Sequence, residues 1–287
     1  MTTAAQHPGN TAVPPRAEIG VIGGSGLYEF LEDAEPVRVD TPFGPPSGDP
    51  VIGEVAGRTV AFLPRHGTDH RFPPHRVNYR ANLWALRALG VRQVLAPCAV
   101  GSLVPAHGPG TIVLPDQVID RTSGRPHTVY DMEGPVVHVA FADPYCPSGR
   151  AAVRAAVSPD AGPVVDGGTL VVINGPRFGS RAESRWHAAA GGTVVGMTGM
   201  PEASVARELA MCFTAVAMVT DHDAGVEAGE AVTHAEVLAA FAANIDRLRG
   251  LLMSAIEALP AHEPDDTATC PCRRVLDGMT LPIELPR

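Results

Sequence analysis

Short apolar runs alternate with helical patterns along most of this chain, and this alternation limits the possible folds more than any other feature. The runs lie at residues 19–22, 51–63, 93–96, 111–114, 169–173, 193–195 and 213–220. Patterns with helical spacing lie between them, at 76–89, after Ser180, at about 201–211 and after Thr233. Strands that alternate with helices are typical of a single α/β domain, in which helices cover a sheet.

Local sequence signals support the ends of these predicted helices and strands. Ser180 with Glu183, and Thr233 with Glu236, match the capping box that starts a helix. Gly90 follows the pattern at 76–89, where a glycine commonly ends a helix. The run at 51–63 alternates around Gly57-Arg58 and predicts a hairpin.

No linker-like break interrupts residues 18–257, so we expect these residues to form the domain. A flexible arm at 1–17 would precede it and an extended tail at 258–287 would follow it. The arm lacks the apolar run of a signal peptide, and no stretch of about 18 apolar residues could span a membrane. We therefore expect a cytoplasmic protein without a membrane partner.

Composition excludes several classes of function. The 287 residues carry a net charge of −9 and no basic cluster, so nucleic acid is not an expected partner. All 22 basic residues are arginine, and the absence of lysine excludes Schiff-base chemistry and a P-loop. The five cysteines are an odd, scattered set, unlike a secreted disulfide framework.

Residues suited to an anion follow three of the predicted strands. The Gly-Gly-Ser-Gly segment at 23–26 offers backbone N–H groups and the Ser25 hydroxyl, although a structural tight turn fits equally well. It is not a dinucleotide-binding loop, because the third glycine is missing. Arg65 and His66 suit a phosphate, with an exposed turn as the alternative. Thr198 would add a hydroxyl.

Two carboxylates end the run at 213–220. Asp221 and Asp223 flank His222, and carboxylates that are partly buried need hydrogen-bond donors or a raised pKa. The edge of adenine supplies donors through its amino group and a protonated N7. An exposed acidic loop is one alternative. A metal site is a second alternative with less support, because no further ligands follow at a suitable spacing. Phe178 is placed either to stack on a base or to pack in the core.

An anion site, an aromatic side chain and a carboxylate pair would thus all lie at strand ends, where open α/β sheets bind ligands. This combination is what phosphorolysis of a purine nucleoside requires. None of the three features is decisive alone.

Several segments, in order and at consistent spacing over about residues 18–257, resemble those of the methylthioadenosine phosphorylase family. They are Ile22-Gly23-Gly24-Ser25-Gly26-Leu27, Pro64-Arg65-His66-Gly67, Asn78-Tyr79-Arg80-Ala81-Asn82, Gly175-Pro176-Arg177-Phe178, Ser180-Arg181-Ala182-Glu183-Ser184, Met197-Thr198 with Pro201-Glu202, and Thr220-Asp221-His222-Asp223.

This resemblance implies a central mixed, twisted sheet flanked by helices, assembled as a homotrimer or as a hexamer of two trimers. It places phosphate against Ser25, Arg65, His66, Thr198 and the backbone near Ala99. It places the nucleoside against Phe178, Met197, Asp221, Asp223, Val237 and Leu238. It also implies that His138 reaches the 5′ end of the nucleoside from a neighbouring subunit.

The resemblance implies the chemistry as well. Phosphate, a co-substrate, attacks C1′ while the glycosidic bond breaks, and the bound dianion stabilises the positive charge on the ribose. Asp221 would donate a proton to N7 and Asp223 would accept from the 6-amino group, so we expect Asp221, His66 and Arg65 to be catalytic. The expected reaction converts 5′-methylthioadenosine and phosphate to adenine and 5-methylthioribose 1-phosphate, without a metal or organic cofactor.

The chain departs from the family pattern at four positions. Gly179 and Gly196 replace polar side chains, and Cys98 stands where a threonine is common. His234 replaces a valine that contacts the methylthio group, and resembles a histidine that binds a 5′-hydroxyl. Adenosine or a 5′-deoxy-5′-halo-adenosine is therefore an alternative substrate, unless His234 faces solvent.

Three other functions stay open on the sequence. One is a phosphorylase for 6-oxopurine nucleosides such as inosine, guanosine or methylthioinosine, although ionised carboxylates would repel their carbonyl oxygen. The others are a non-catalytic nucleoside-binding protein and a dinucleotide-binding enzyme, which rests only on the first glycine loop and is a poor match because the third glycine is missing. Cys270-Pro271-Cys272 resembles a Cys-x-Cys tail of some relatives; we expect a reduced pair, with a disulfide or a metal site as alternatives.

Overall fold

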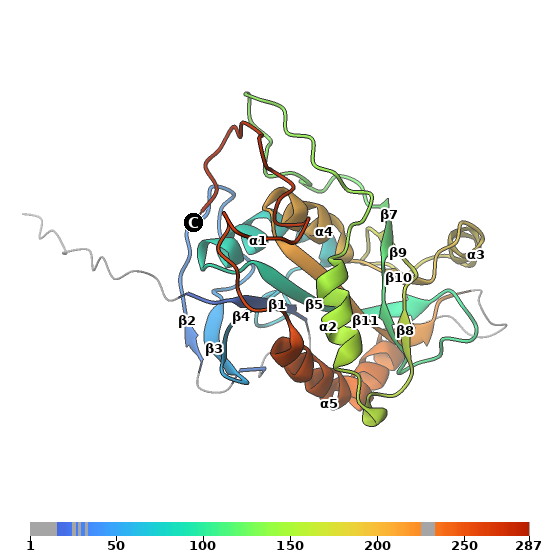
Figure 1. Ribbon diagram of the computed structural model, residues 1–287. Coiled ribbons are helices and arrows are strands. Elements are labelled where there is room, and N and C mark those ends of the chain that lie inside the picture. The colour runs from blue at the N-terminus through green and yellow to red at the C-terminus, as the bar shows by residue number, and fades with distance from the viewer. Residues whose placement is uncertain (1–15, 25–26, 28–29, 32–33, 225–232, 287) are drawn as a thin grey trace, which may run out of the picture.

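The computed structural model describes residues 16–24, 27, 30–31, 34–224 and 233–286. Within them, eleven strands form one mixed sheet (Figure 1). The strands are β1 (Ile19–Gly23), β2 (Glu35–Pro36), β3 (Val51–Val55), β4 (Arg58–Pro64), β5 (Gln93–Ser102), β6 (Ile112–Leu114), β7 (Gln117–Arg121), β8 (Val164–Asp166), β9 (Thr169–Ile173), β10 (Val194–Gly196) and β11 (Cys212–His222).

Strand β5 is the centre of the sheet. β11 runs parallel to it and pairs with one of its edges from Gln93 to Ser102. The other edge pairs first with β1, in parallel, and further along with β10, in antiparallel. β1 continues through β4, β3 and β2, while β10 continues through β9 and β7. The expected central mixed sheet flanked by helices is therefore confirmed.

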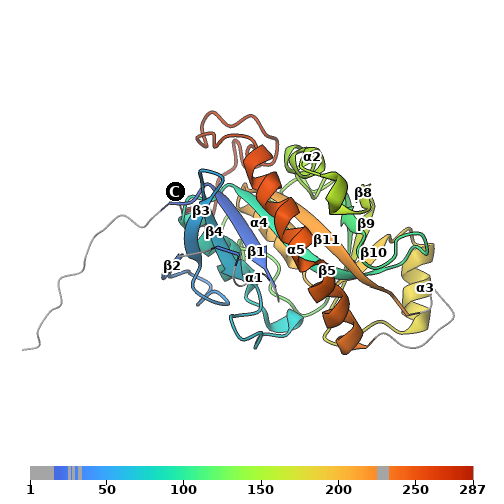
Figure 2. The ribbon, with the colours of Figure 1, turned by 90° about the horizontal axis from the view of Figure 1, so that it is seen from below.

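The helices are α1 (Tyr79–Ala88), α2 (Pro147–Ala155), α3 (Arg181–Ala189), α4 (Gly199–Glu208) and α5 (His234–Ala258). α1 packs with α4, and α2 packs with α5 (Figures 1 and 2). Each pair contributes to a separate cluster of buried apolar side chains. The sheet therefore has an apolar core on both faces, as an α/β domain requires.

The predicted elements agree with the structure in type and differ at their ends. Both capping boxes form, with the Ser180 and Thr233 hydroxyls accepting from the N–H groups of Glu183 and Glu236. α1 begins later than predicted, because the residues before it form a short 3-10 turn starting at Pro74. α2 was not predicted, because its buried face consists of Gly149, Ala152 and Val153, of which only Val153 is a sizeable apolar side chain.

The predicted arm lies outside the described residues as far as residue 15, whereas Ala17 is buried and its N–H donates to Leu89 O at 2.8 Å. The tail has no helix or strand in its described part, from 259 to 286, but Ala268 and Cys272 are 2% exposed. The tail is therefore packed against the domain. Among the described residues, no helix combines the length and apolarity needed to cross a bilayer.

Candidate active site

A gap in the pairing of β5 creates a pocket. β1 pairs with β5 only as far as Leu95, and β10 pairs with the same edge only at Gly101 and Ser102. Because β10 is antiparallel to β5, the carboxyl ends of β1 and β10 approach this gap from opposite directions. Ala99, inside the gap, is exposed although its strand is central. A ligand can therefore reach the backbone of β5 here.

The pocket at this gap has a volume of about 310 Å³, within the range of small-molecule sites. It brings together most of the residues that the sequence singled out. Those that line it are Arg65, His66, Ala99, Phe178, Met197, Thr198, Asp221, Asp223, Val237 and Leu238.

Three predicted residues are not in this lining. Ser25 lies outside the described residues. His234 is the first residue of α5, but its side chain is not described. His138 is exposed in the segment between β7 and α2, outside the pocket of its own chain.

Arg65 follows β4 and is 2% exposed. Its Nε and Nη2 donate to the two carboxylate oxygens of Glu202 at 2.6 and 3.1 Å, and Nη1 donates to Pro97 O at 3.0 Å. A further bond from Nη2 to Ile22 O leaves one Nη1 hydrogen without a partner among the described residues. Glu202 therefore fixes the guanidinium and balances its charge, while one donor stays available.

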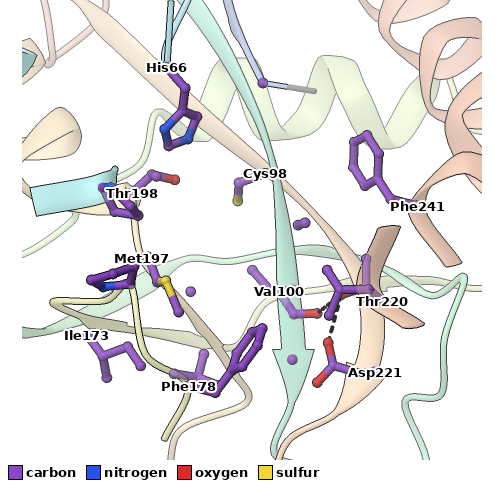
Figure 3. A pocket seen from close by; sticks show the side chains of 18 of the residues that line it. His66, Cys98, Val100, Ile173, Phe178, Met197, Thr198, Thr220, Asp221 and Phe241 are labelled. Carbon is purple, nitrogen blue, oxygen red and sulfur yellow. Dashed lines mark hydrogen bonds between the residues drawn. The ribbon is translucent and has the colours of Figure 1, made fainter. Parts of the chain in front are cut away.

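His66 projects into the pocket (Figure 3). Its Nδ1 lies 2.8 Å from Phe72 O, so Nδ1 carries the hydrogen and donates it to that carbonyl. Burial, together with the positive charge of Arg65, lowers the pKa of His66 to about 4. His66 is therefore neutral at neutral pH, with Nε2 as an acceptor.

Arg125 joins two of the loops that line the pocket. It donates to Asn174 O at 2.8 Å, to Met197 O at 2.9 Å and to Met200 O at 2.5 Å. These bonds tie the end of β9 to the segment after β10, which carries Thr198. The Thr198 hydroxyl makes no capping bond to α4, although the residue stands at its N-cap. That hydroxyl is therefore available to a ligand.

Asp221 lies near the end of β11, on the pocket side of the sheet. The Thr220 hydroxyl lies 2.8 Å from Asp221 Oδ2 and 3.2 Å from Val100 O (Figure 3). Burial, together with the nearby charge of Asp223, raises the pKa of Asp221 to about 6 in spite of the opposing hydrogen bond from Thr220. A carboxyl with this pKa can act as a proton donor near neutral pH.

Asp223 has different surroundings. It is 5% exposed, its N–H donates to Ser102 O at 2.9 Å, and the Ser184 hydroxyl of α3 donates to its Oδ2. Oδ1 has no hydrogen-bond partner among the described residues. Asp223 therefore presents one carboxylate oxygen as an acceptor.

Apolar side chains lie between these polar groups. Phe178 and Met197 lie on one side of the pocket, and Phe241 of α5 lies on another (Figure 3). Val237 and Leu238 line the pocket from the first turn of α5. The pocket thus has separate polar groups across an apolar interior, which suits a flat heterocycle joined to a sugar.

Three residues of this site were missed from the sequence. Glu202 and Arg125 act through contacts between segments far apart in the chain, and no local pattern marks such pairs. Phe241 was assigned only to the apolar spacing of α5. The predicted capping box at Thr233 offered a signal for it, because it fixes where α5 begins and hence which residues occupy its first turns.

The mixed sheet and the pocket beside β5 are those of a nucleoside phosphorylase fold. The chain belongs to the phosphorylase superfamily, whose family model matches residues 18–257. It is therefore a pentosyltransferase that uses phosphate as a substrate.

Named relatives resemble the chain over nearly their whole length. A purine nucleoside phosphorylase of Streptomyces coelicolor is 61% identical over 278 residues, covering 94% of this chain and 98% of the relative. An S-methyl-5′-thioadenosine phosphorylase of Mycolicibacterium smegmatis is 56% identical over 269 residues, covering 93% and 99%. The methylthioadenosine phosphorylase of Schistosoma mansoni in complex with adenine superposes with a TM-score of 0.79, at 37% identity, covering 84% of this chain and 91% of that one.

Proposed function

We propose that this chain catalyses phosphorolysis of an adenine nucleoside, converting 5′-methylthioadenosine and phosphate to adenine and 5-methylthioribose 1-phosphate. The observation that carries the proposal is Asp221, a pocket carboxyl with its pKa raised to about 6 beside a second carboxylate. This pair complements the adenine edge, which has an acceptor at N7 and a donor at N6. Relatives named methylthioadenosine phosphorylases support the choice of nucleoside.

Phosphate would bind at the gap in β5. The unpaired Nη1 hydrogen of Arg65, the Thr198 hydroxyl and the backbone near Ala99 supply donors, and Ser25 is the further predicted ligand. Neutral His66 has an acceptor at Nε2, and the hydrogen phosphate dianion carries one O–H. The phosphate would therefore donate that hydrogen to His66, which would orient an ionised oxygen toward C1′.

The nucleoside would lie between phosphate and the carboxylates. Phe178 and Met197 would flank the base and ribose, and Val237 with Leu238 would contact the 5′ substituent. Protonated Asp221 would donate to N7 as the glycosidic bond breaks, so the adenine leaves neutral. Asp223 Oδ1 would accept from the 6-amino group. The phosphate dianion would stabilise the charge on the ribose, and the proposal requires no metal or organic cofactor.

The assembly proposed is a homotrimer or hexamer. Its support is that His138, which resembles a family residue contacting the 5′ end, is exposed and away from its own pocket. In an oligomer His138 would close the pocket of a neighbouring subunit, next to His234. A cytoplasmic location stays a prediction.

A second candidate is phosphorolysis of adenosine or a 5′-halogenated adenosine. The observation that favours it is the position of His234 at the start of α5, one turn before pocket residues Val237 and Leu238. A donor there would interact better with a hydroxyl or halogen than with a methylthio group.

A competition assay tests these proposals. The purified protein receives equal concentrations of 5′-methylthioadenosine, adenosine and inosine, with and without phosphate, and the released bases and sugar phosphates are quantified. We expect phosphate-dependent release of adenine, mainly from methylthioadenosine. Predominant adenosine turnover would instead favour the second candidate. Hypoxanthine as the main product would overturn the role of the carboxylates, and no release would contradict both proposals.

A further inference from the structure

Four of the five cysteines gather at one place, away from the pocket. Cys212 is the first residue of β11, Cys146 precedes α2, and Cys270 and Cys272 belong to the tail. Among the described residues they are the one group of His, Cys, Asp or Glu side chains close enough to share a metal ion. Three segments that are distant in the sequence therefore meet at their sulfur atoms, with Cys146 and Cys270 separated by 124 residues.

The spacing of the sulfurs matches a metal site better than disulfide bonds. Cys270 Sγ lies 3.7 Å from Cys146 Sγ and 3.5 Å from Cys212 Sγ, and all four sulfurs lie within 4.8 Å of one another. A disulfide joins its sulfurs at about 2.05 Å. Four thiolates bound to zinc at about 2.3 Å lie about 3.8 Å apart, at the corners of a tetrahedron. The observed distances are close to that arrangement.

The surroundings favour thiolates. Cys146 is the N-cap residue of α2, and the Gly149 N–H donates to its sulfur at 3.4 Å. The positive end of a helix and N–H donors both stabilise a thiolate. Cys146, Cys212 and Cys272 are almost fully buried and Cys270 is half-buried, so a bound ion would be shielded from water.

We propose that Cys146, Cys212, Cys270 and Cys272 bind one zinc ion in a closed, tetrahedral, structural site. Four sulfur ligands leave no open position for a substrate or a reactive water. The site lies at the start of β11, whereas Asp221 lies nine residues along the strand, about 30 Å away in extended chain. The ion would therefore stabilise the fold and take no part in the reaction.

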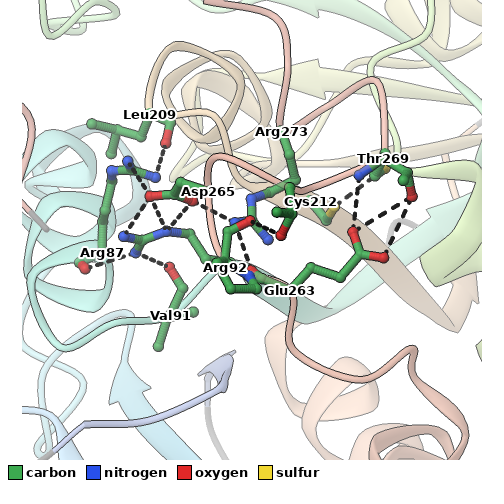
Figure 4. Close-up of polar contacts among 12 residues, drawn as sticks. Arg87, Val91, Arg92, Leu209, Cys212, Glu263, Asp265, Thr269 and Arg273 are labelled. Atoms are coloured by element: carbon green, nitrogen blue, oxygen red, sulfur yellow. Dashed lines mark hydrogen bonds and ion pairs between the residues drawn. The ribbon is translucent and has the colours of Figure 1, made fainter.

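The zinc would attach the tail to the domain. Beside it, Asp265 of the tail forms ion pairs with Arg87, Arg92 and Arg273 (Figure 4). At the start of the tail, Arg58 donates to Leu259 O and Pro260 O, and Gln93 donates to Pro260 O. Beyond that start the described part of the tail has no helix or strand, and the pairs of Asp265 with Arg87 and Arg92, together with the cysteine cluster, link it to the core. Loss of the metal would therefore expose the tail first and weaken the contacts of α2 with β11.

Metal analysis of the intact protein tests the proposal. The protein is produced in zinc-supplemented medium, purified without chelators, and analysed for all transition metals by mass spectrometry. We expect about one zinc per chain. Titration with an organomercurial should release the zinc as four thiols react, which needs no variant and therefore no assumption about folding of a mutant. Metal removal should lower Tm and speed proteolysis of the tail, and added zinc should reverse both changes.

Variants separate this site from the remaining cysteine. The double variant Cys270→Ser/Cys272→Ser should lose the zinc, whereas Cys98→Ser, which changes the pocket cysteine, should retain it. Four reduced thiols without metal, or a mass lowered by the hydrogens of two disulfides, would overturn the proposal. Stoichiometric iron in place of zinc would overturn the assignment of the ion.

Discussion

At the scale of single residues, side chains of one type have different proposed roles in the pocket because their neighbours differ. Asp221 is partly buried, and this burial raises its pKa to about 6 although the Thr220 hydroxyl donates to its carboxylate. Asp223 accepts from Ser184 and presents its other oxygen. The carboxylate of Glu202 balances the positive charge of Arg65. The remaining Nη1 hydrogen of Arg65 can therefore bind an anion without a large net positive charge in the pocket. The proposed roles follow from these surroundings.

The variant Asp221→Asn tests the proton donor. We expect kcat/KM for 5′-methylthioadenosine to fall about 100-fold or more, because an amide cannot transfer a proton to N7. Phosphate affinity should stay unchanged, and turnover of inosine should gain relative to adenine nucleosides, since an amide can donate to a carbonyl oxygen. In the wild type, the fraction of protonated Asp221 falls as pH rises through about 6, so the rate should fall with it. The variant should lack this decrease in its pH–rate profile.

Asp40→Asn is the matched control, because Asp40 has an exposed carboxylate outside the pocket. It should behave as the wild type. If Asp221→Asn turns over methylthioadenosine at the wild-type rate, Asp221 is not the proton donor. Calorimetric measurement of phosphate binding to both variants would show whether any loss is confined to the nucleoside step.

At the scale of elements, the pocket depends on where β1, β10 and α5 end or begin. The gap in β5 exists because β1 leaves its edge after Leu95 and β10 reaches it at Gly101. α5 starts with a capping box at Thr233 and brings Val237 and Leu238 to the pocket within its first turns. The ordering of that first turn therefore shapes the wall of the site.

Removal of this cap is expected to affect nucleoside binding. Thr233→Ala should destabilise the start of α5 by about 1 kcal/mol, because the Glu236 N–H loses its acceptor. KM for the nucleoside should rise several-fold, while kcat and the KM for phosphate change little. Thr233→Ser retains the hydroxyl and should restore the wild-type KM. Equal KM values for all three proteins would show that this turn does not shape the pocket.

The elements could be predicted from the sequence where the signal is local. The strand at 169–173 and both capping boxes appear at the predicted residues. The gap in β5 could not be predicted, because it depends on the register of strands distant in the sequence. The Arg65–Glu202 pair and the contact of Cys146 with the tail could not be predicted for the same reason. The sequence thus predicted ten of the residues that line the pocket, but neither Phe241 nor the partners that balance or orient the charged side chains.

At the scale of the whole molecule, the tail is held by a cluster of charges as well as by cysteines. Arg92 and Arg273 contact Asp265, and Arg87 lies 3.3 Å from the same carboxylate. Burial by itself would raise the pKa of Asp265, but these arginines hold it well below its usual range. One carboxylate therefore offsets three neighbouring positive charges.

Asp265→Asn should lower Tm at neutral pH by about 2–4 °C, because the three arginines then repel one another. A depressed carboxyl pKa stabilises the fold above its unfolded value near 3.8, and this stabilisation is lost as pH falls below that value. The Tm difference between variant and wild type should therefore be full at neutral pH and shrink below about pH 4. Asp277→Asn, which breaks an exposed pair with Arg274, serves as the control. An unchanged Tm for Asp265→Asn would mean that the charges do not hold the tail.

Strand β11 has a consequence for how the molecule opens. It is buried over Cys212–Thr220, hydrogen bonded along β5 and paired with β6 at Ala217 and Met218. No partial opening can expose the amides in its middle without separating the core on both faces of the sheet. Their exchange with deuterated water therefore reports global unfolding, whereas amides in the tail report its detachment. A single exchange experiment would thus measure the two stabilities separately in one sample.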